Sequence, residues 1–430
     1  MKIESALAIL NSHKPIAQKS VEWIAARKNL IAASEAGYLL GIRSCSSMIN
    51  YIKAKCNLTT PLDGLSKLDS IRHGNIYEDV ARAIYQSRHG VIVKEYGLIT
   101  TSKNTFLGAS PDGIVIQEHI TQSGEFFPSG KSSQMGETSQ SGESRIGRIV
   151  EIKNPYDFDP SDTIKPEYAI QILQQQYVLE LPQCDFIKAN IIGSIVNAKT
   201  ASKGFNPYHD INDFLADIPN IHSLETKSTI ANHNIPVCNL THRGTEKGVI
   251  IHYNQPETGQ LITRLYPLDT PYTKAGILEW IKTTKSNIAI ENGICKSHIA
   301  VEYWYLAAYF EKTLEYDAQL FENIYLPRLE LAWRLIGHVR QLQDSQPPDT
   351  VIGFIDTILK AHLGRPSAFY KSASNQVEIC EILSGALKLY LADVKIIQSL
   401  PKTEKVKEKV KEEGKEKANR RENELIEYDF

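Results

Sequence analysis

The sequence lacks the marks of membrane, secreted and thiolate-metal proteins. No apolar run reaches the about 18 residues that a membrane-spanning helix needs. The first residues, M-K-I-E-S-A-L-A-I-L, carry an early lysine and a short apolar run but no persuasive signal-peptide pattern. The six cysteines are scattered and form no CxxC pair, which argues against a zinc ribbon or a disulfide framework. We therefore expect an intracellular, cytoplasmic protein with no membrane partner.

An excess of either charge is also missing. The 430 residues include 48 Lys and Arg against 50 Asp and Glu, so the formal net charge is -2. A nucleic-acid-binding protein with this balance must concentrate its basic side chains locally, around its binding cleft. The length allows two or three modest domains, or one domain with additions.

The most informative stretch runs from Leu107 to Lys153. Asp112 stands just before an alternating apolar run, and Glu151 and Lys153 flank Ile152 in a second apolar run. Because residues i and i+2 of a strand share a face, Glu151 and Lys153 should point the same way and Ile152 into the core. Two carboxylates suit a hard cation such as Mg²⁺, and a nearby ammonium can hold a phosphate oxygen or a water. The alternative is an ordinary surface hairpin with an exposed ion pair.

The periodicity predicts a strand over residues 91–100 and another over 106–116, the second carrying Asp112. Residues 117–147 are rich in Gly, Ser, Gln and Glu, with few side chains that could pack. We predict a flexible insertion between two paired strands there. Residues 191–247 are mixed in composition and indicate little.

Two segments before Asp112 have helical patterns. Residues 21–41 predict helix, short loop, helix, with Ser34 as an N-cap and Gly41 as a C-terminal stop. Residues 72–85 predict a helix with an apolar stripe, and Glu78 lies off the centre of that stripe. Glu78 could face the site, or could only pair with Arg82 one turn away.

A third helical pattern follows Lys153. In residues 166–187, Gln171 and Gln175 lie one turn apart on a helix, and a C-D-F strand comes next. A merely solvated helix face would be rich in Glu or Lys, so Gln171 is predicted to belong to the site.

The P-D and E-x-K residues resemble the signature of the PD-(D/E)XK nuclease superfamily. More closely, the chain resembles the YqaJ-like viral recombinase family of lambda-type exonucleases. Four separated blocks carry this resemblance in the right order. The matching residues outside the D…ExK set include Trp23, Arg27, Ser34, Gly41, His73, Gly74, Glu78, Ala81, Tyr168, Gln171, Gln175, Trp304, Pro327 and Trp333.

The resemblance implies an α/β fold with a PD-(D/E)XK restriction-endonuclease-like core, in which helices flank a central mixed sheet. It implies a YqaJ-like nuclease domain over residues 1–345, interrupted by the insertions 117–147 and 191–247. A helical extension over 346–400 and a charged tail over 401–430, helical or disordered, should follow.

The activity implied by the resemblance is that of a Mg²⁺- or Mn²⁺-dependent 5′-to-3′ exonuclease. It would resect linear double-stranded DNA for recombination or repair, in viral DNA metabolism. By resemblance, the metal would be held by Asp112, Glu151, the Ile152 carbonyl and Glu78. Catalysis would use Asp112, Glu151, Lys153, Glu78 and Gln171, and substrate would be bound by Arg27, Ser34 and Tyr168.

The expected partners are DNA ends with a 5′-phosphate, a single-strand annealing protein and further copies of the chain. Two alternatives stay open. One is a structure-specific endonuclease on the same fold, and the other is a non-catalytic DNA- or protein-binding descendant.

Overall fold

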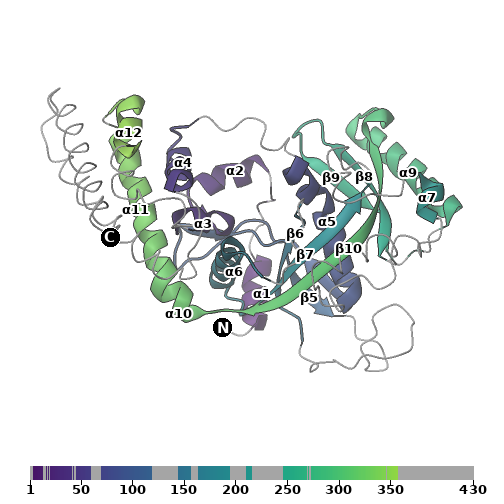
Figure 1. Ribbon diagram of the computed structural model, residues 1–430, viewed down its shortest axis with the longest axis horizontal. Helices are drawn as coiled ribbons and strands as arrows, with labels where there is room; N and C mark the ends of the chain where they lie inside the picture. The colour runs from purple at the N-terminus through teal and green to yellow at the C-terminus, as the bar shows by residue number, and fades with distance from the viewer. Residues whose placement is uncertain are drawn as a thin grey trace, which may run out of the picture.

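The protein is described here from a computed structural model (Figure 1). The structure describes residues 3–12, 16, 18, 20–40, 42, 45–59, 69–118, 144–155, 163–193, 210–215, 246–268, 270, 273–344 and 346–356. None of the helices in these ranges is long and apolar enough to cross a membrane.

A seven-stranded mixed sheet forms the centre of the molecule, with strand order β2-β5-β6-β7-β10-β8-β9. Strands β6 and β7 run parallel, and the other neighbours in this sheet are antiparallel. The strands are β2 (Val91–Lys94), β5 (Gly113–Glu118), β6 (Ile149–Lys153), β7 (Gln183–Gly193), β8 (Lys247–Asn254), β9 (Leu261–Leu265) and β10 (Ala300–Glu315). A second, three-stranded sheet has the order β1-β4-β3, from β1 (Ile31–Ala32), β3 (Ile99–Thr100) and β4 (Leu107–Ala109).

Helices flank the large sheet, so the predicted mixed α/β class is confirmed (Figure 1). The N-terminal helices are α1 (Ile3–Ser12), α2 (Val21–Lys28), the 3₁₀ turn η1 (Ala33–Glu35), α3 (Ala36–Leu39), α4 (Cys45–Lys55) and α5 (Asp69–His89). The later ones are α6 (Pro166–Leu179), α7 (Ile211–Leu215), α9 (Lys274–Asn292), η5 (Lys296–His298), α10 (Ala318–Leu320), the π-helical turn η6 (Phe321–Tyr325), α11 (Leu326–Gln343) and α12 (Pro348–Phe354).

The alternation of β6 divides the core between the two faces of the sheet. Ile149 packs on one face in a hydrophobic cluster with Ile170 of α6. Val150 and Ile152 pack on the other face with Val80 of α5. Since Glu151 has the parity of Ile149, its side chain points toward α6. Ile152 is buried in the core as predicted.

The predicted strand over 106–116 is wrong in one respect, because it is two strands in two sheets. β4 belongs to the small sheet and β5 to the large one, and Asp112 lies in the turn between them. Pro111 has no N–H to give to a ladder, which favours a break there. Gly113 then permits close packing, since a Cβ on it would lie 2.1 Å from Cγ1 of Val93.

The predicted strand over 91–100 also divides, into β2 and β3. Gly97 between them has φ +67, and a Cβ there would lie 2.1 Å from the carbonyl oxygen of Ile16. A residue other than glycine would be strained in this turn.

The N-terminal block forms helix, turn, helix, but Ser34 is not the N-cap. It lies inside η1, whose capping residue is Ala32. The Glu35 carboxylate accepts the Ala32 N–H at 3.1 Å instead, so an acid three positions after the capping residue satisfies the free backbone donor. Gly41 lies outside the described residues.

The segments around the insertions are only partly described. Strand β5 reaches into the first insertion as far as Glu118, and α7 lies in the second. Helix α12 begins the predicted C-terminal extension, while the predicted tail 401–430 lies outside the described residues. The division into a nuclease domain, a helical extension and a charged tail therefore stays a prediction.

Candidate active site

Glu151 lies at the centre of the candidate site, on β6. Its side chain is fully buried. It accepts hydrogen bonds from Lys153 Nζ, from Gln171 Nε2 at 2.6 Å and from Gln175 Nε2 at 2.7 Å. A carboxylate offers about four lone-pair positions, so these three donors leave room for one further ligand.

Four glutamines of α6, Gln171 and the consecutive Gln174, Gln175 and Gln176, hold this carboxylate and the backbone around it. Gln171 and Gln175, one helical turn apart, reach the two oxygens of Glu151. Gln174 donates to the carbonyl oxygens of Ile31 and Gly108, and Gln176 donates to those of Pro182 and Leu314. All four side chains are buried. The glutamine-rich helix therefore fixes both the carboxylate and the surrounding backbone.

Asp112 stands beside Glu151 at the turn before β5. Its Oδ2 accepts the Ile152 N–H at 2.7 Å. Burial and the negative charge of Glu151 raise the pKa of Asp112 to about 7, although Lys153 and the Ile152 N–H act in the opposite direction. Two carboxylates therefore share this site under mutual repulsion.

Lys153 shares the face of Glu151, as the i and i+2 spacing predicted, and its side chain is 23% exposed. Burial by itself would lower the pKa of Lys153, but attraction to Glu151 and Asp112 outweighs it and the pKa is raised. The ammonium form is thereby favoured over the free amine.

The chemistry of the donors fits a divalent cation. Asp112 and Glu151 are hard oxygen donors of the kind that Mg²⁺ prefers, and a cation would relieve the repulsion that raises the pKa of Asp112. Over the described ranges, however, no three His, Cys, Asp or Glu side chains gather as a metal-binding group. Glu78, half-buried on α5, therefore adds no third ligand of this kind to the pair. Its alternative partner Arg82 forms ion pairs with Asp79 and Glu95.

A second charged cluster lies in the N-terminal block, where the structure brings Arg27 and Ser34 together. One Arg27 nitrogen donates to the Ser34 hydroxyl at 3.2 Å and to Glu35 at 2.7 Å, and the guanidinium lies 4.3 Å from the centre of the Trp23 ring. Arg27 is thus held in a fixed orientation with 20% of its side chain exposed.

Glu35 neutralises part of this cluster. It also accepts from Tyr51 at 3.0 Å and pairs with Lys55 at 2.9 Å. Burial favours the neutral acid, but Lys55 and Arg27 prevail and lower the pKa of Glu35. Because two cations face one carboxylate, the cluster keeps a net positive charge suited to an anion.

The two clusters are joined by direct contacts. The Trp23 indole N–H donates to the Ser110 hydroxyl at 3.1 Å, and the Gln18 amide donates to the Pro111 carbonyl at 3.2 Å. The block that carries Arg27 is therefore tied to the turn that carries Asp112.

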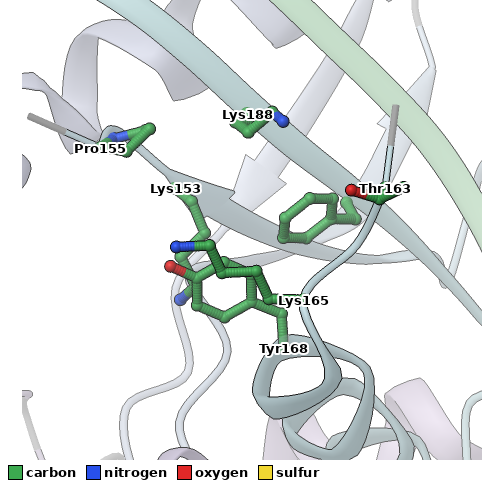
Figure 2. A pocket seen from close by; sticks show the side chains of 7 residues that line it. Lys153, Pro155, Thr163, Lys165, Tyr168 and Lys188 are labelled. Carbon is green, nitrogen blue, oxygen red and sulfur yellow. The ribbon is translucent and has the colours of Figure 1, made fainter. Parts of the chain in front are cut away.

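Tyr168 lies on the other side of Lys153, at the start of α6. Lys153 Nζ is 5.4 Å from the centre of its ring. Figure 2 shows Tyr168 in a pocket that Lys153, Lys165 and Lys188 also line.

The structure brings together most of the side chains that the sequence predicts for the site. Those that the structure gathers around Glu151 are Asp112, Lys153, Ile152 through its N–H, Gln171 and Tyr168, with Arg27 and Ser34 together in the adjoining cluster. Sequence reasoning gave no role to Gln175, Glu35, Lys165 or Lys188. Of these, only Gln175 had a local signal, its position one turn after Gln171.

A mixed sheet flanked by helices has the P-D residues just before one strand, the E-x-K residues on the neighbouring strand and a helix over the acidic face, which is the arrangement that the resemblance implied. Residues 22–203 match the YqaJ-like viral recombinase domain. This match confirms the resemblance that the sequence blocks predicted.

Known relatives cover the chain unevenly. It is 24% identical over 351 residues, 79% of its length, to the uncharacterized protein R354 of Acanthamoeba polyphaga mimivirus, and it spans 56% of that protein. Among solved structures, the alkaline exonuclease LHK-Exo from Laribacter hongkongensis is 26% identical, with 40% of this chain and 74% of that chain covered. The TM-score is 0.29, and the complex of LHK-Exo with dAMP gives the same values. At that TM-score the fold assignment rests on the strands and helices described above.

Proposed function

We propose that this chain is a metal-dependent deoxyribonuclease that degrades linear double-stranded DNA from its 5′ ends. The observation that carries the proposal is the buried Glu151, fixed by Lys153 and two glutamines beside a second carboxylate with a raised pKa. A structural ion pair alone would not need Asp112, whose charge opposes that of Glu151. Recombination or repair is the process that the YqaJ-like domain favours.

In this proposal Asp112, Glu151 and the Ile152 carbonyl hold Mg²⁺ or Mn²⁺. When bound, the metal supplies Lewis-acid polarisation of the phosphate and a lowered pKa for bound water. Gln171 and Gln175 keep the Glu151 oxygens oriented. Lys153, favoured as the ammonium, donates to a phosphate oxygen and offsets the negative charge that develops during hydrolysis.

Arg27 and Ser34 are proposed to hold the terminal 5′-phosphate. A guanidinium binds phosphate through paired N–H donors, and Arg27 is already oriented by Glu35 and Trp23. The contact from Trp23 to Ser110 ties this anion site to the turn of Asp112. A free end bound at Arg27 would thereby be kept in register with the carboxylates.

The test is digestion of linear, 5′-phosphorylated duplex DNA beside a closed circle, with Mg²⁺ or with EDTA, by the wild-type chain and by Asp112→Asn. Loss of the linear DNA alone, only with Mg²⁺ and only by the wild type, is the expected result. Cutting of the circle would indicate an endonuclease instead. No cutting by folded protein would favour a binding protein without catalysis. Assembly with further copies and with a single-strand annealing protein remains a prediction.

A further inference from the structure

We propose that the pocket between β6, β7 and the start of α6 binds a second phosphate of the cleaved strand, the neighbour of the scissile phosphate. Its ligands are Lys165 and Lys188, and Tyr168 lines the pocket with them. The proposal rests on the proposed function for the placing of the scissile phosphate at Asp112 and Glu151. It assigns a role to two lysines that the D…ExK set does not include.

The pocket is strongly cationic. Among the described residues, its lining holds three lysines, Lys153, Lys165 and Lys188, and no carboxylate residue (Figure 2). Glu151 offsets the charge of Lys153, since the two form an ion pair. Lys165 is exposed and has no ion pair with a described residue. The pocket therefore has the charge to hold an anion.

The strand register concentrates this charge. In the parallel pairing of β6 with β7, Lys153 lies opposite Lys188. Neighbouring strands are about 4.8 Å apart, and like charges that face each other across strands repel. Lys188 is 7% exposed and its ammonium lies 5.3 Å from the centre of the Phe310 ring. A phosphate between the two strands would lie within reach of both ammonium groups.

The beginning of α6 adds to the attraction. Lys165 is the residue before the first turn, and α6 runs for 14 residues, so the positive end of its dipole faces the pocket side. The ammonium groups of Lys153 and Lys165 lie 5.4 Å and 6.0 Å from the centre of the Tyr168 ring. The ring thus lies near both cations and lines the pocket (Figure 2).

Lys153 indicates which ligand the pocket binds, because Lys153 belongs both to the carboxylate site and to the pocket. Its ammonium contacts Glu151 and also lines the pocket. A strand whose scissile phosphate lies at the carboxylates must pass beside Lys153, which brings an adjacent phosphate of the same strand to Lys165 and Lys188. A duplex backbone carries such phosphates at every nucleotide.

The experiment measures binding of a fluorescent, 5′-phosphorylated duplex in EDTA, so that no cleavage is needed. The variants are Lys165→Ala and Lys188→Met, and the matched control is Lys282→Ala on α9, whose side chain is 77% exposed. Each pocket variant should weaken binding about tenfold and reduce the salt dependence by about one counterion, uniformly across sequences. The control should bind like the wild type.

A second arm locates the phosphate. A neutral methylphosphonate is placed at successive positions of the cleaved strand. At the position next to the scissile phosphate it should weaken binding by the wild type about tenfold and leave the pocket variants with no further loss. Pocket variants that bind like Lys282→Ala, or losses that add at every position, would overturn the proposal. A loss of binding that occurs only with 5′-phosphorylated ends would also overturn the proposal. The pocket would then hold the terminal phosphate.

The outcomes separate this inference from the proposed function. If the wild type binds DNA but cuts none, the binding result still decides whether the pocket holds a phosphate. If the wild type cuts DNA and the variants bind normally, the pocket proposal alone fails. Lys165 is exposed, so its alanine variant should keep the fold even if Lys188→Met does not, and equal melting temperatures check this.

Discussion

Two glutamates in this molecule, the buried Glu151 and the half-buried Glu35, have opposite electrostatic surroundings. Glu151 faces one ammonium and a second carboxylate, and that neighbour, Asp112, has its pKa raised to about 7. Glu35 faces two cations, Arg27 and Lys55, and its own pKa is lowered. The first cluster carries an excess of negative charge and the second an excess of positive charge.

This difference in local charge shows how one chain with almost no net charge could bind both a cation and a polyanion. Each cluster uses a buried carboxylate to orient its neighbours, and the remaining charge decides which ligand would be attracted. The excess carboxylate at Glu151 suits a metal ion. The excess guanidinium at Arg27 suits a phosphate. Substitutions at the two glutamates should therefore have different effects.

The largest effect is expected for Glu151→Gln. This change removes a proposed metal ligand and presents an amide to the donors of Gln171 and Gln175. Loss of several kcal/mol of transition-state stabilisation should lower kcat on the order of 1,000-fold. Single-turnover cleavage with Mg²⁺ measures it. Glu279→Gln on α9, where the side chain is 68% exposed, is the matched control and should cut like the wild type.

Glu35→Gln should instead cost stability. It leaves Arg27 and Lys55 without their carboxylate, and breaking a largely buried ion pair destabilises by about 3 kcal/mol. Urea unfolding, with its midpoint and slope, measures the change. At temperatures where the variant is folded, kcat at saturating DNA should stay within about twofold of the wild type. A fall in kcat as deep as that of Glu151→Gln would mean that the two clusters act as one.

The sequence predicted the Glu151 cluster well because its geometry is local. The i and i+2 spacing put Glu151 and Lys153 on one face, and the helical turn put Gln171 beside them. Strand and helix periods are set by the backbone, so these contacts need no knowledge of the tertiary fold. The alternation also placed Ile152 correctly in the core.

The N-terminal cluster and the pocket depend on long-range contacts, which the sequence does not display. Ser34 has the chemistry of an N-cap, yet Glu35 supplies the capping oxygen because Arg27 and Lys55 hold its carboxylate in place. Lys188 meets Lys153 only through the register of two parallel strands. The break between β4 and β5 likewise lies where Trp23 contacts Ser110.

In the absence of metal, the pH dependence of stability should distinguish the Glu151 cluster from the Glu35 cluster. Asp112 has a folded pKa of about 7, above its ordinary value of 3.8. Between these two pH values the folded state therefore binds more protons than the unfolded state. As pH rises from about 4 to 7, the stability of the folded state falls, and Asp112 contributes up to about 1.4 kcal/mol per pH unit to this fall. Urea unfolding in EDTA should show a smaller decline for Asp112→Asn. Mg²⁺ at pH 7 should restore stability to the wild type alone.

The smallest effect is expected for Arg27→Lys, which keeps the positive charge but loses the paired N–H donors. The ratio of kcat/KM for 5′-phosphorylated over 5′-hydroxyl DNA should fall about fivefold, because a point charge recognises the phosphate less specifically. Arg264→Lys, at an exposed position on β9, is the control and should keep the ratio. An unchanged ratio in Arg27→Lys would assign Arg27 to the support of Glu35 alone. The positive cluster would then be structural, and the difference in charge between the two clusters would not determine where the DNA end binds.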